Sequence, residues 1–236
     1  MMIEFFEEEN DFKAGSLICI DKALEWTSFD VVKKVKFGIQ RKFDLKKLKV
    51  GHAGTLDPLA TGLVIICTGK GTKQIDKYMG QTKEYTCTIK LGATTPSFDL
   101  ESEEDNTYEY KHITRELIDE KLKEFIGEID QVPPIFSALK INGVRAYTMA
   151  REGEEFEIKS RKIQIHEIEV LNFDGQNLEL RIVCGKGTYI RSMARDIGVA
   201  LDSGGYLIAL RRTAIGDYKV KDALSVDAFL GKLSEF

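Results

Sequence analysis

The chain has 236 residues, of which 43% are hydrophobic and 31% are charged, and its formal net charge at pH 7 is −4. This length suffices to bury a sizeable core as one large domain or two small ones, and no apolar run approaches the roughly 18 residues that a membrane-spanning helix needs. The acidic N-terminus predicts neither a signal peptide nor a transit peptide. Taken alone, the net charge argues against a polyanionic partner.

The distribution of charge is uneven. Residues 1–13 carry a net charge of −4 and residues 99–109 a net charge of −6, which leaves +6 for the rest of the chain. Within that rest, residues 33–49 hold eight lysines and arginines against one acid, Asp44. Such a cluster can neutralise the phosphates of a nucleic acid, although charge runs of this kind more often cover a solvated helix face.

The first half of the chain predicts an acidic tail followed by alternating elements. Ser28 is the expected N-cap of a helix whose apolar residues recur at helical spacing. Residues 94–112 are polar and acidic, which predicts a loop. The predicted elements are a tail at 1–15, strands at 17–21, 62–68 and 84–91, and a helix at 28–39.

The second half predicts more strands than helices. Asn142-Gly143 indicates a hairpin turn after residues 136–141. The remaining predicted elements are helices at 114–126, 188–201 and 226–233 and strands at 162–171, 178–184 and 206–210. Because strands and helices do not alternate regularly, we expect an α+β fold with a mixed, largely antiparallel sheet flanked by helices.

The four cysteines occur singly inside apolar stretches, at positions 19, 67, 87 and 184. No CxxC motif occurs, and the three histidines have no metal-like spacing. We therefore expect buried free thiols in a reducing cytoplasm and no metal site.

The segment from Gly51 to Gly62 is the densest cluster of special residues. It combines three glycines, His52, Asp57 and Pro58 between the basic segment and an apolar strand. Glycines allow close backbone approach, and Pro58 restricts Asp57 to extended conformations. A single carboxylate held in such a loop suits a nucleophile or a base, and a turn-capping aspartate explains the pattern equally well.

Two further segments carry candidate functional residues. Residues 69–73 do not satisfy the phosphate-loop pattern, because Val64 stands where that pattern needs a glycine. Residues 185–191 form a glycine turn that leads into a helix and places Tyr189 and Arg191 in its first turn. A helix start favours anions, so Arg191 could pair with a carboxylate or a phosphate.

Together these residues carry a family resemblance. The segment 51–63 closely resembles the catalytic loop GHxGxLDPxAxGxL of TruB-type tRNA pseudouridine synthases. Further segments match in the same order: Lys83–Tyr85, Leu91-Gly92, 132–140, 143–153, 185–191, 210–213 and 225–227. The chain departs from the family at residues 21–28, where a DKPxGxTS turn is replaced by a segment without its proline and glycine.

The resemblance implies an isomerase with the pseudouridine synthase fold. Its reaction converts uridine 55 in the T loop of tRNA to pseudouridine, and it needs no cofactor and no metal. The expected partner is the T stem-loop of tRNA, with no membrane, and the expected state is a monomeric cytoplasmic protein that also assists tRNA folding. We expect residues 16–236 to form one catalytic domain with no C-terminal PUA-type domain after it.

The resemblance also assigns roles to individual residues. Asp57 would be the catalytic carboxylate, attacking the sugar or the base or assisting a glycal route, with Arg191 as its ion-pair partner. Tyr85 would stack on the flipped uracil, and Tyr189 would form a hydrogen bond near Asp57 or the uracil. His52 would fill space beside the extruded nucleotide, and Leu210 would form an apolar wall. The expected phosphate contacts are Lys22, Lys73, Lys140, Arg211 and Arg212.

Two alternatives remain at this point. A non-catalytic tRNA-binding or tRNA-folding factor could use the same surface, although the joint presence of Asp57, Tyr85 and Arg191 speaks against it. A nucleoside hydrolase would normally require a second acid, and no paired carboxylates flank Asp57.

Overall fold

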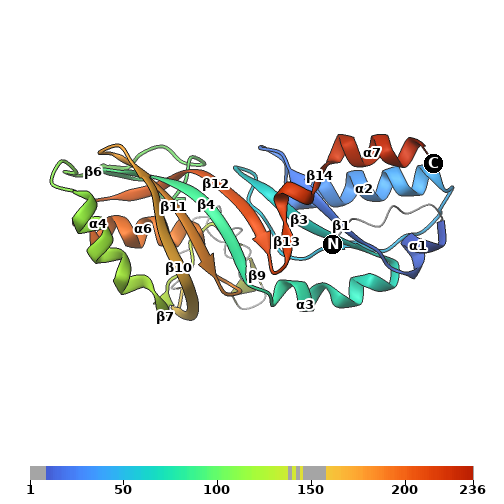
Figure 1. Cartoon of the computed structure of the whole chain (residues 1–236), viewed down its shortest axis with the longest axis horizontal. Coiled ribbons are helices and arrows are strands. Elements are labelled where there is room, and N and C mark those ends of the chain that lie inside the picture. The colour runs from blue at the N-terminus through green and yellow to red at the C-terminus, as the bar shows by residue number, and fades with distance from the viewer. Residues whose placement is uncertain (1–8, 138–139, 142–143, 146–157, 236) are drawn as a thin grey trace. The chain divides into compact units, whose positions relative to one another are not determined.

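The computed structural model describes residues 9–137, 140–141, 144–145 and 158–235. The chain divides into two compact units, of which unit 1 comprises residues 1–85 and 210–236 and unit 2 comprises residues 86–209. Figure 1 labels the elements of both. The prediction that residues 16–236 act as one catalytic domain is not tested by this division and stays a prediction.

Unit 1 is built on a strand order β14-β1-β3-β12, with β2 added to β3 and β13 to β12. The pairs β1–β14 and β3–β12 are parallel, and β1–β3 is antiparallel. Its strands are β1 (Leu17–Lys22), β2 (Val50–His52), β3 (Ala60–Thr68), β13 (Tyr218–Lys219), β14 (Leu224–Ser225) and parts of β4 (Lys83–Leu91) and β12 (Gly205–Ile215). Its helices are α1 (Glu9–Ala14), α2 (Ser28–Lys42), α3 (Ile75–Met79) and α7 (Val226–Glu235), with 3-10 turns η1 (Gly69–Gln74) and η3 (Val220–Asp222).

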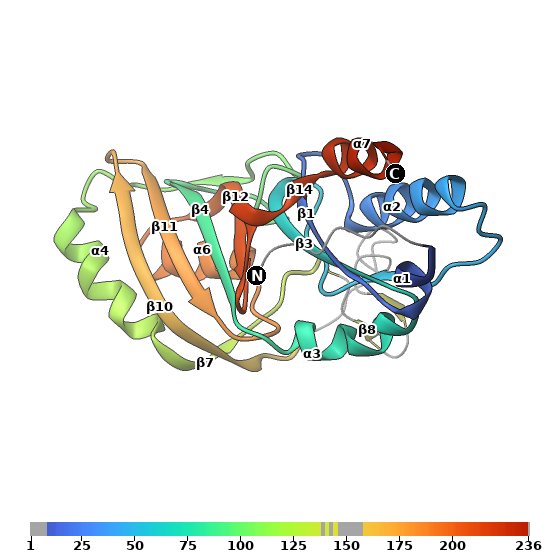
Figure 2. The same ribbon diagram turned by 45° about the vertical axis from the view of Figure 1, so that its right-hand side comes forward.

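Helix α2 packs on the sheet and beside α7, as both Figure 1 and Figure 2 show. Its N-cap is Thr27, one residue before the predicted Ser28. The Thr27 hydroxyl accepts the Asp30 N–H at 3.0 Å, and the Asp30 carboxylate accepts the Thr27 N–H at 3.2 Å. This reciprocal capping box sets the helix start.

Residues 9–14 correct the predicted acidic tail. They form α1, and the side chain of Phe12 is buried beside Phe43, with ring centroids 5.7 Å apart. Burial of an aromatic ring offsets the cost of ordering this short segment.

Unit 2 has the strand order β12-β4-β11-β10-β7. The pairs β10–β11 and β10–β7 are antiparallel. Its further elements are β5 (Ala93–Thr94), β6 (Asn106–Thr107), α4 (Arg115–Lys121), η2 (Leu122–Phe125), β7 (Gly127–Gln131), β8 (Lys140–Ile141), β9 (Val144–Arg145), β10 (Arg161–Phe173), β11 (Asn177–Cys184) and α6 (Ile190–Ala200). The fold is α+β with a mixed, largely antiparallel sheet, as predicted.

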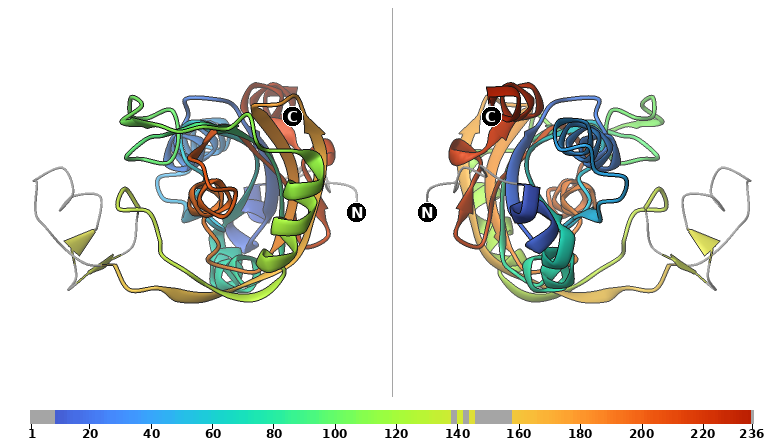
Figure 3. Two further views of the ribbon diagram at one scale, coloured as in Figure 1. Left: turned by 90° about the vertical axis from the view of Figure 1, so that its left-hand side faces the viewer. Right: turned by 90° about the vertical axis from the view of Figure 1, so that its right-hand side faces the viewer.

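Helix α6 lies on the inner side of the curved strands of unit 2, and Figure 3 shows the helix end-on. Its apolar face, which includes Ile190, Met193 and Ile197, is buried. The helix approaches β12 so closely that a Cβ added at Gly198 would lie 2.4 Å from the backbone nitrogen of Gly205. A glycine is therefore required at this crossing.

The acidic segment 94–112 is tied to the rest of unit 2 by side chains. Glu104 accepts hydrogen bonds from Lys90 at 2.8 Å and from the Tyr206 hydroxyl at 2.7 Å, and Thr94 bonds Asp105. The predicted hairpin turn Asn142-Gly143 lies outside the described residues, although β8 and β9 on either side of it pair antiparallel.

Candidate active site

Asp57 lies in the short loop between β2 and β3, in unit 1. Its side chain is half-buried, and its backbone carbonyl accepts the N–H of Ala60 at 3.1 Å. Gly54 precedes it with a φ of +103°, a conformation that side-chain-bearing residues rarely adopt. The loop is thus a tight turn that leads directly into the buried strand β3.

The Arg212 side chain clamps the loop on the N-terminal side of Asp57. This side chain is 1% exposed, and its guanidinium donates to the carbonyls of Gly54 at 3.2 Å, Thr55 at 3.3 Å and Leu63 at 2.7 Å. A planar fork with several donors is suited to holding three carbonyls at once.

Lys22 holds the loop on the other side. Its side chain is fully buried, and its ammonium donates to the carbonyls of Ala23 at 2.9 Å, Trp26 at 2.6 Å and Pro58 at 3.3 Å. Burial lowers the pKa of Lys22 to about 8, while the Asp57 carboxylate acts in the opposite direction. Two buried cations therefore flank the peptide that carries Asp57.

Ser28, at the start of α2, fixes the middle of the loop. Its hydroxyl oxygen accepts the Leu56 N–H at 2.8 Å and its hydroxyl donates to the Leu56 carbonyl at 3.2 Å. Together with the hydrogen bonds of Arg212 and Lys22, these two bonds anchor the main chain from Gly54 to Pro58. Such pre-organisation is what positions a reacting carboxylate.

Three other predicted site residues belong to unit 1. His52 ends β2, and burial lowers the pKa of its imidazole, which keeps it neutral near pH 7. Leu210 pairs with Ala60 in the parallel β12–β3 register, so its backbone is next to the end of the Asp57 loop. Tyr85 lies near the start of β4, where its side chain is buried.

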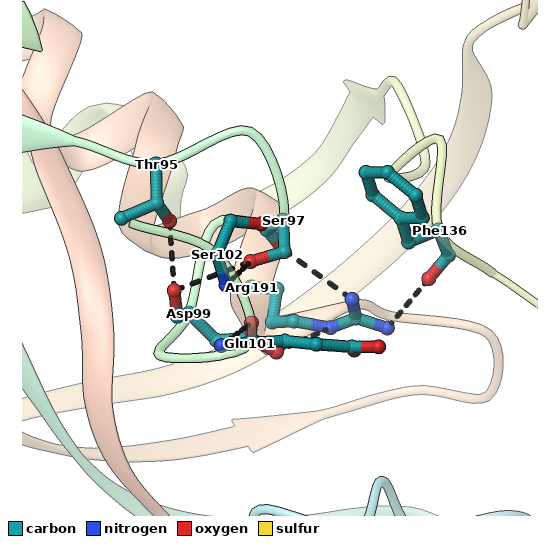
Figure 4. A network of polar contacts seen from close by, with 7 residues as sticks. All are labelled: Thr95, Ser97, Asp99, Glu101, Ser102, Phe136 and Arg191. Carbon is teal, nitrogen blue, oxygen red and sulfur yellow. Dashed lines mark hydrogen bonds and ion pairs between the residues drawn. The ribbon is translucent and has the colours of Figure 1, made fainter. Parts of the chain in front are cut away.

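Arg191 lies in unit 2, in the first turn of α6. Its buried guanidinium donates to the carbonyls of Ser97 at 3.3 Å and Phe136 at 2.9 Å, and its Nε is 3.6 Å from Asp99 Oδ2 (Figure 4). Asp99 is itself buried and accepts the N–H of Glu101 at 2.9 Å. The predicted ion pair of Arg191 with Asp57 joins residues of different units and stays a prediction.

Tyr189 caps the start of α6 and is held at both backbone atoms by one side chain. The buried amide of Gln131 accepts the Tyr189 N–H at 2.9 Å and donates to its carbonyl at 3.1 Å. The guanidinium of Arg161 lies 4.7 Å from the centre of the Tyr189 ring and also bonds the Gly187 carbonyl. Gln131 on β7 and Arg161 on β10 therefore position the Tyr189 ring.

The expected phosphate contacts divide into two groups. Lys22 and Arg212 do not fit this role, because both side chains are buried and their donors point at main-chain carbonyls. Lys73 is exposed in η1, and Arg211 is part-exposed and paired with Asp21 at 2.7 Å. The side chain of Lys140 lies outside the described residues.

Asp99, Gln131 and Ser28 are site-supporting residues that the sequence analysis missed. Asp99 was counted only as one of the acids of segment 99–109, and Ser28 only as a helix cap. Gln131 carried no motif. Asp99 contacts Arg191 92 positions away, Gln131 bonds Tyr189 58 positions away, and Ser28 bonds Leu56 28 positions away. No local pattern reports contacts at such separations.

Within the described ranges, no group of three or more His, Cys, Asp or Glu side chains is arranged to hold a metal ion. Across the same ranges, no helix is long and apolar enough to span a membrane. All four cysteines are buried and are thiols outside any disulfide, as predicted.

Comparison with known proteins identifies the family. Residues 40–190 match the family model described as TruB family pseudouridylate synthase, N-terminal domain. The chain is 57% identical over 219 residues to the protein named tRNA pseudouridine synthase B of Phocaeicola vulgatus, covering 93% of both chains.

Two solved structures share the fold. A chain of a Cbf5-Nop10-Gar1 complex matches with a TM-score of 0.68 and 28% identity over 95% of this chain. A chain of an H/ACA RNP bound to a substrate RNA containing 2′-deoxyuridine matches with a TM-score of 0.61 and 27% identity over 88% of this chain. This chain spans 60% and 49% of those two chains, respectively.

The fold and these matches place the chain among the pseudouridylate synthases. Within that class, it belongs to the TruB family.

Proposed function

We propose that this chain is a tRNA pseudouridine synthase that isomerises uridine 55 in the T loop. The glycosidic C–N bond breaks, the uracil turns in the site, and a C–C bond forms at C5 while the C5 proton is lost and N1 gains one. The name of the Phocaeicola vulgatus relative supports tRNA as the substrate. The observation that carries the proposal is the clamped loop of Asp57, in which buried cations hold the carbonyls on both sides of one half-buried carboxylate.

Asp57 is the catalytic carboxylate in this proposal. Lys22, Arg212 and Ser28 all bind the main chain of its loop, on both sides of the reacting residue. A carboxylate presented by a pre-organised loop does not have to be reoriented when the RNA arrives.

The other site residues handle the extruded nucleotide. The target base leaves the folded loop, which costs a few kcal/mol of stacking. His52 fills space beside the extruded nucleotide, Tyr85 stacks on the uracil and Leu210 forms an apolar wall. Tyr189 forms a hydrogen bond near Asp57 or the uracil, and Arg191 is the ion-pair partner of Asp57. Lys73, Arg211 and Lys140 remain the candidate phosphate contacts.

The proposal includes the setting in which the protein acts. The partner is the T stem-loop of tRNA, the protein works as a cytoplasmic monomer, and residues 16–236 act as one catalytic domain. Buried cysteines outside any disulfide support a reducing compartment.

The decisive experiment incubates the protein with a T-arm stem-loop RNA and maps pseudouridine. We expect conversion by the native chain, essentially none by Asp57→Asn, and unchanged RNA affinity in that variant. Asp217→Asn removes an exposed carboxylate of unit 1 and serves as the matched control, with native conversion expected.

Each other outcome has a defined meaning. Native-rate conversion by Asp57→Asn would exclude Asp57 as the catalytic carboxylate. Binding and refolding of tRNA without any conversion by the native chain would support the non-catalytic folding factor. Release of free uracil would indicate a hydrolase instead.

A further inference from the structure

A groove of about 560 Å³ lies in unit 1 along the exposed face of α2, the helix labelled in Figure 2. The turn before the helix supplies Glu25 and Trp26, and the helix supplies Asp30, Lys33, Lys34 and Phe37. None of these residues has a part in the proposed reaction.

The groove combines aromatic surfaces with exposed positive charge, of which the Lys33 ammonium lies 3.8 Å from the Asp30 carboxylate. Phe37 is 64% exposed, which is unusual for an aromatic side chain on a packed helix. The Lys33 ammonium lies 4.6 Å from the centre of the neighbouring Phe29 ring, which is also exposed. Of the two acids, Asp30 is engaged in the capping box with Thr27. Aromatic faces beside lysines are the surface type on which unpaired bases stack.

The groove borders the loop of Asp57. One buried ammonium, that of Lys22, binds the carbonyl of Trp26 and the carbonyl of Pro58. The Glu25 N–H donates to the same Pro58 carbonyl at 2.8 Å. The Lys22 ammonium therefore links Trp26, which lines the groove, to Pro58, the residue after Asp57, within unit 1.

The charge of the surrounding sequence favours a polyanion over a peptide. The groove lies along α2, and the basic segment 33–49 starts within this helix. That segment carries eight cations and one acid. Neutralising phosphates along such a segment releases counterions and strengthens binding.

We propose that this groove binds unpaired nucleotides of the substrate RNA next to the reacting uridine. The bases stack on Trp26 and Phe37, and Lys33 and Lys34 contact the phosphates. This inference rests on the proposed function, because it assigns the path of the same RNA beyond the Asp57 loop.

The chain carries its own probe for this groove, because Trp26 is its single tryptophan. Stacking of a base on the indole quenches its emission, so we titrate the native chain with an unlabelled T-arm stem-loop, a single-stranded oligouridylate and an RNA duplex of equal length. We expect quenching by the stem-loop and by the single strand, and none by the duplex, whose bases are already stacked.

Three variants test the lining residues, with binding followed by anisotropy of a labelled stem-loop. Phe37→Ala should weaken binding about tenfold, the order of one lost stacking contact. The double change Lys33→Ala and Lys34→Ala should reduce the salt dependence of binding by about 1.4 in slope, as two lost phosphate contacts require. Glu25→Gln should tighten binding, since it removes a negative charge from the groove.

The control removes two exposed lysines of unit 1 outside the groove, by Lys219→Ala and Lys221→Ala, and should change the salt slope less. Equal quenching by the duplex, or unchanged affinity in Phe37→Ala, would overturn the groove assignment. Weaker RNA binding by Glu25→Gln would do the same. Pseudouridine formation is measured in parallel to separate the two proposals. If pseudouridine forms while RNA leaves the Trp26 emission unchanged, only the assignment of the groove as an RNA site is refuted.

Discussion

Two buried cations hold the carbonyl oxygens on both sides of Asp57. Lys22 and Arg212 are among the largest fully buried side chains of the described chain, and their donors serve main-chain carbonyls. A buried cation is tolerated only when its donors are satisfied, because desolvation otherwise favours its neutral form. The residues therefore act by positioning the loop, and changing either should affect stability and reaction rate more than RNA affinity.

We predict that Lys22→Met lowers the free energy of unfolding by about 3 kcal/mol, because three part-buried carbonyls each lose a hydrogen bond from the ammonium. Denaturant unfolding measures this value, with the exposed Lys221→Met as the matched control. A loss below that of the control would show that the Lys22 ammonium contributes nothing to stability.

Lys22 should also impose a pH dependence on stability. Its pKa is about 8 in the folded chain, against 10.5 for the ordinary side chain. Between these values the unfolded chain binds the proton that the folded chain has released, so unfolding becomes less favourable as pH rises. The slope of unfolding free energy against pH in this window should be less positive in Lys22→Met than in the native chain.

Arg212→Lys keeps the charge and removes the planar fork that reaches Gly54, Thr55 and Leu63. We predict a tenfold or greater fall in the rate of pseudouridine formation, of the order expected from a displaced reacting group. The dissociation constant for RNA and its salt slope should stay the same. A shallower salt slope would instead restore Arg212 as a phosphate contact.

At the scale of elements, the turn before α2 carries backbone strain. Glu25 has a φ of +66°, at the position where the family turn DKPxGxTS has its glycine. Residues with a Cβ adopt this left-handed region at a cost of about 1–2 kcal/mol, and glycine adopts it freely. The turn keeps its conformation because Glu25 bonds the Pro58 carbonyl and Lys22 bonds the Trp26 carbonyl.

We therefore predict that Glu25→Gly raises the free energy of unfolding by about 0.5–1 kcal/mol, after allowance for the greater entropy of unfolded glycine. Glu25→Ala removes the same carboxylate but keeps the Cβ, so it should bring no comparable gain. Thermal unfolding of the pair measures the difference. Equal stability of the two variants would show that the turn is unstrained.

The elements that the sequence predicted well have strong periodicity. The helix at 28–39, the strand at 62–68 and the strand at 84–91 correspond to α2, β3 and β4. Strands β2 and β7 were missed because Val50–His52 is only three residues long and Gly127–Gln131 contains two acids. Their strand conformation comes from pairing with β3 and β10, which a local pattern does not reveal.

At the scale of the whole molecule, the net charge of −4 conceals a basic remainder. The acidic segment 99–109 is engaged inside unit 2, through Glu104 with Lys90 and Tyr206 and through Asp99 with Arg191. The lysines of segment 33–49 have fewer such partners among the described residues, with Lys33 at 3.8 Å from Asp30. Long-range attraction of RNA should therefore come from that segment.

We predict that neutralising Lys46, Lys47 and Lys49, all exposed, weakens RNA binding and lowers its salt slope by about 2 to 3. Binding measured over a range of salt concentrations tests this. Substituting the exposed Lys111, Lys123 and Lys186 of unit 2 gives a control of equal charge change. The same slope for the 46–49 variant and the native chain would remove the segment from the binding surface.

The sequence by itself determined the family, the α+β class and the candidate catalytic carboxylate. It could do so because the loop 51–63 keeps its special residues contiguous, and contiguous motifs and periodic apolar faces are local properties. Only the tertiary structure decided what the charged residues do. Lys22, Arg212 and Asp99 read as surface charges along the chain, yet each is buried against groups from distant segments. Burial and partners depend on which segments meet in space, and that information is absent from local pattern.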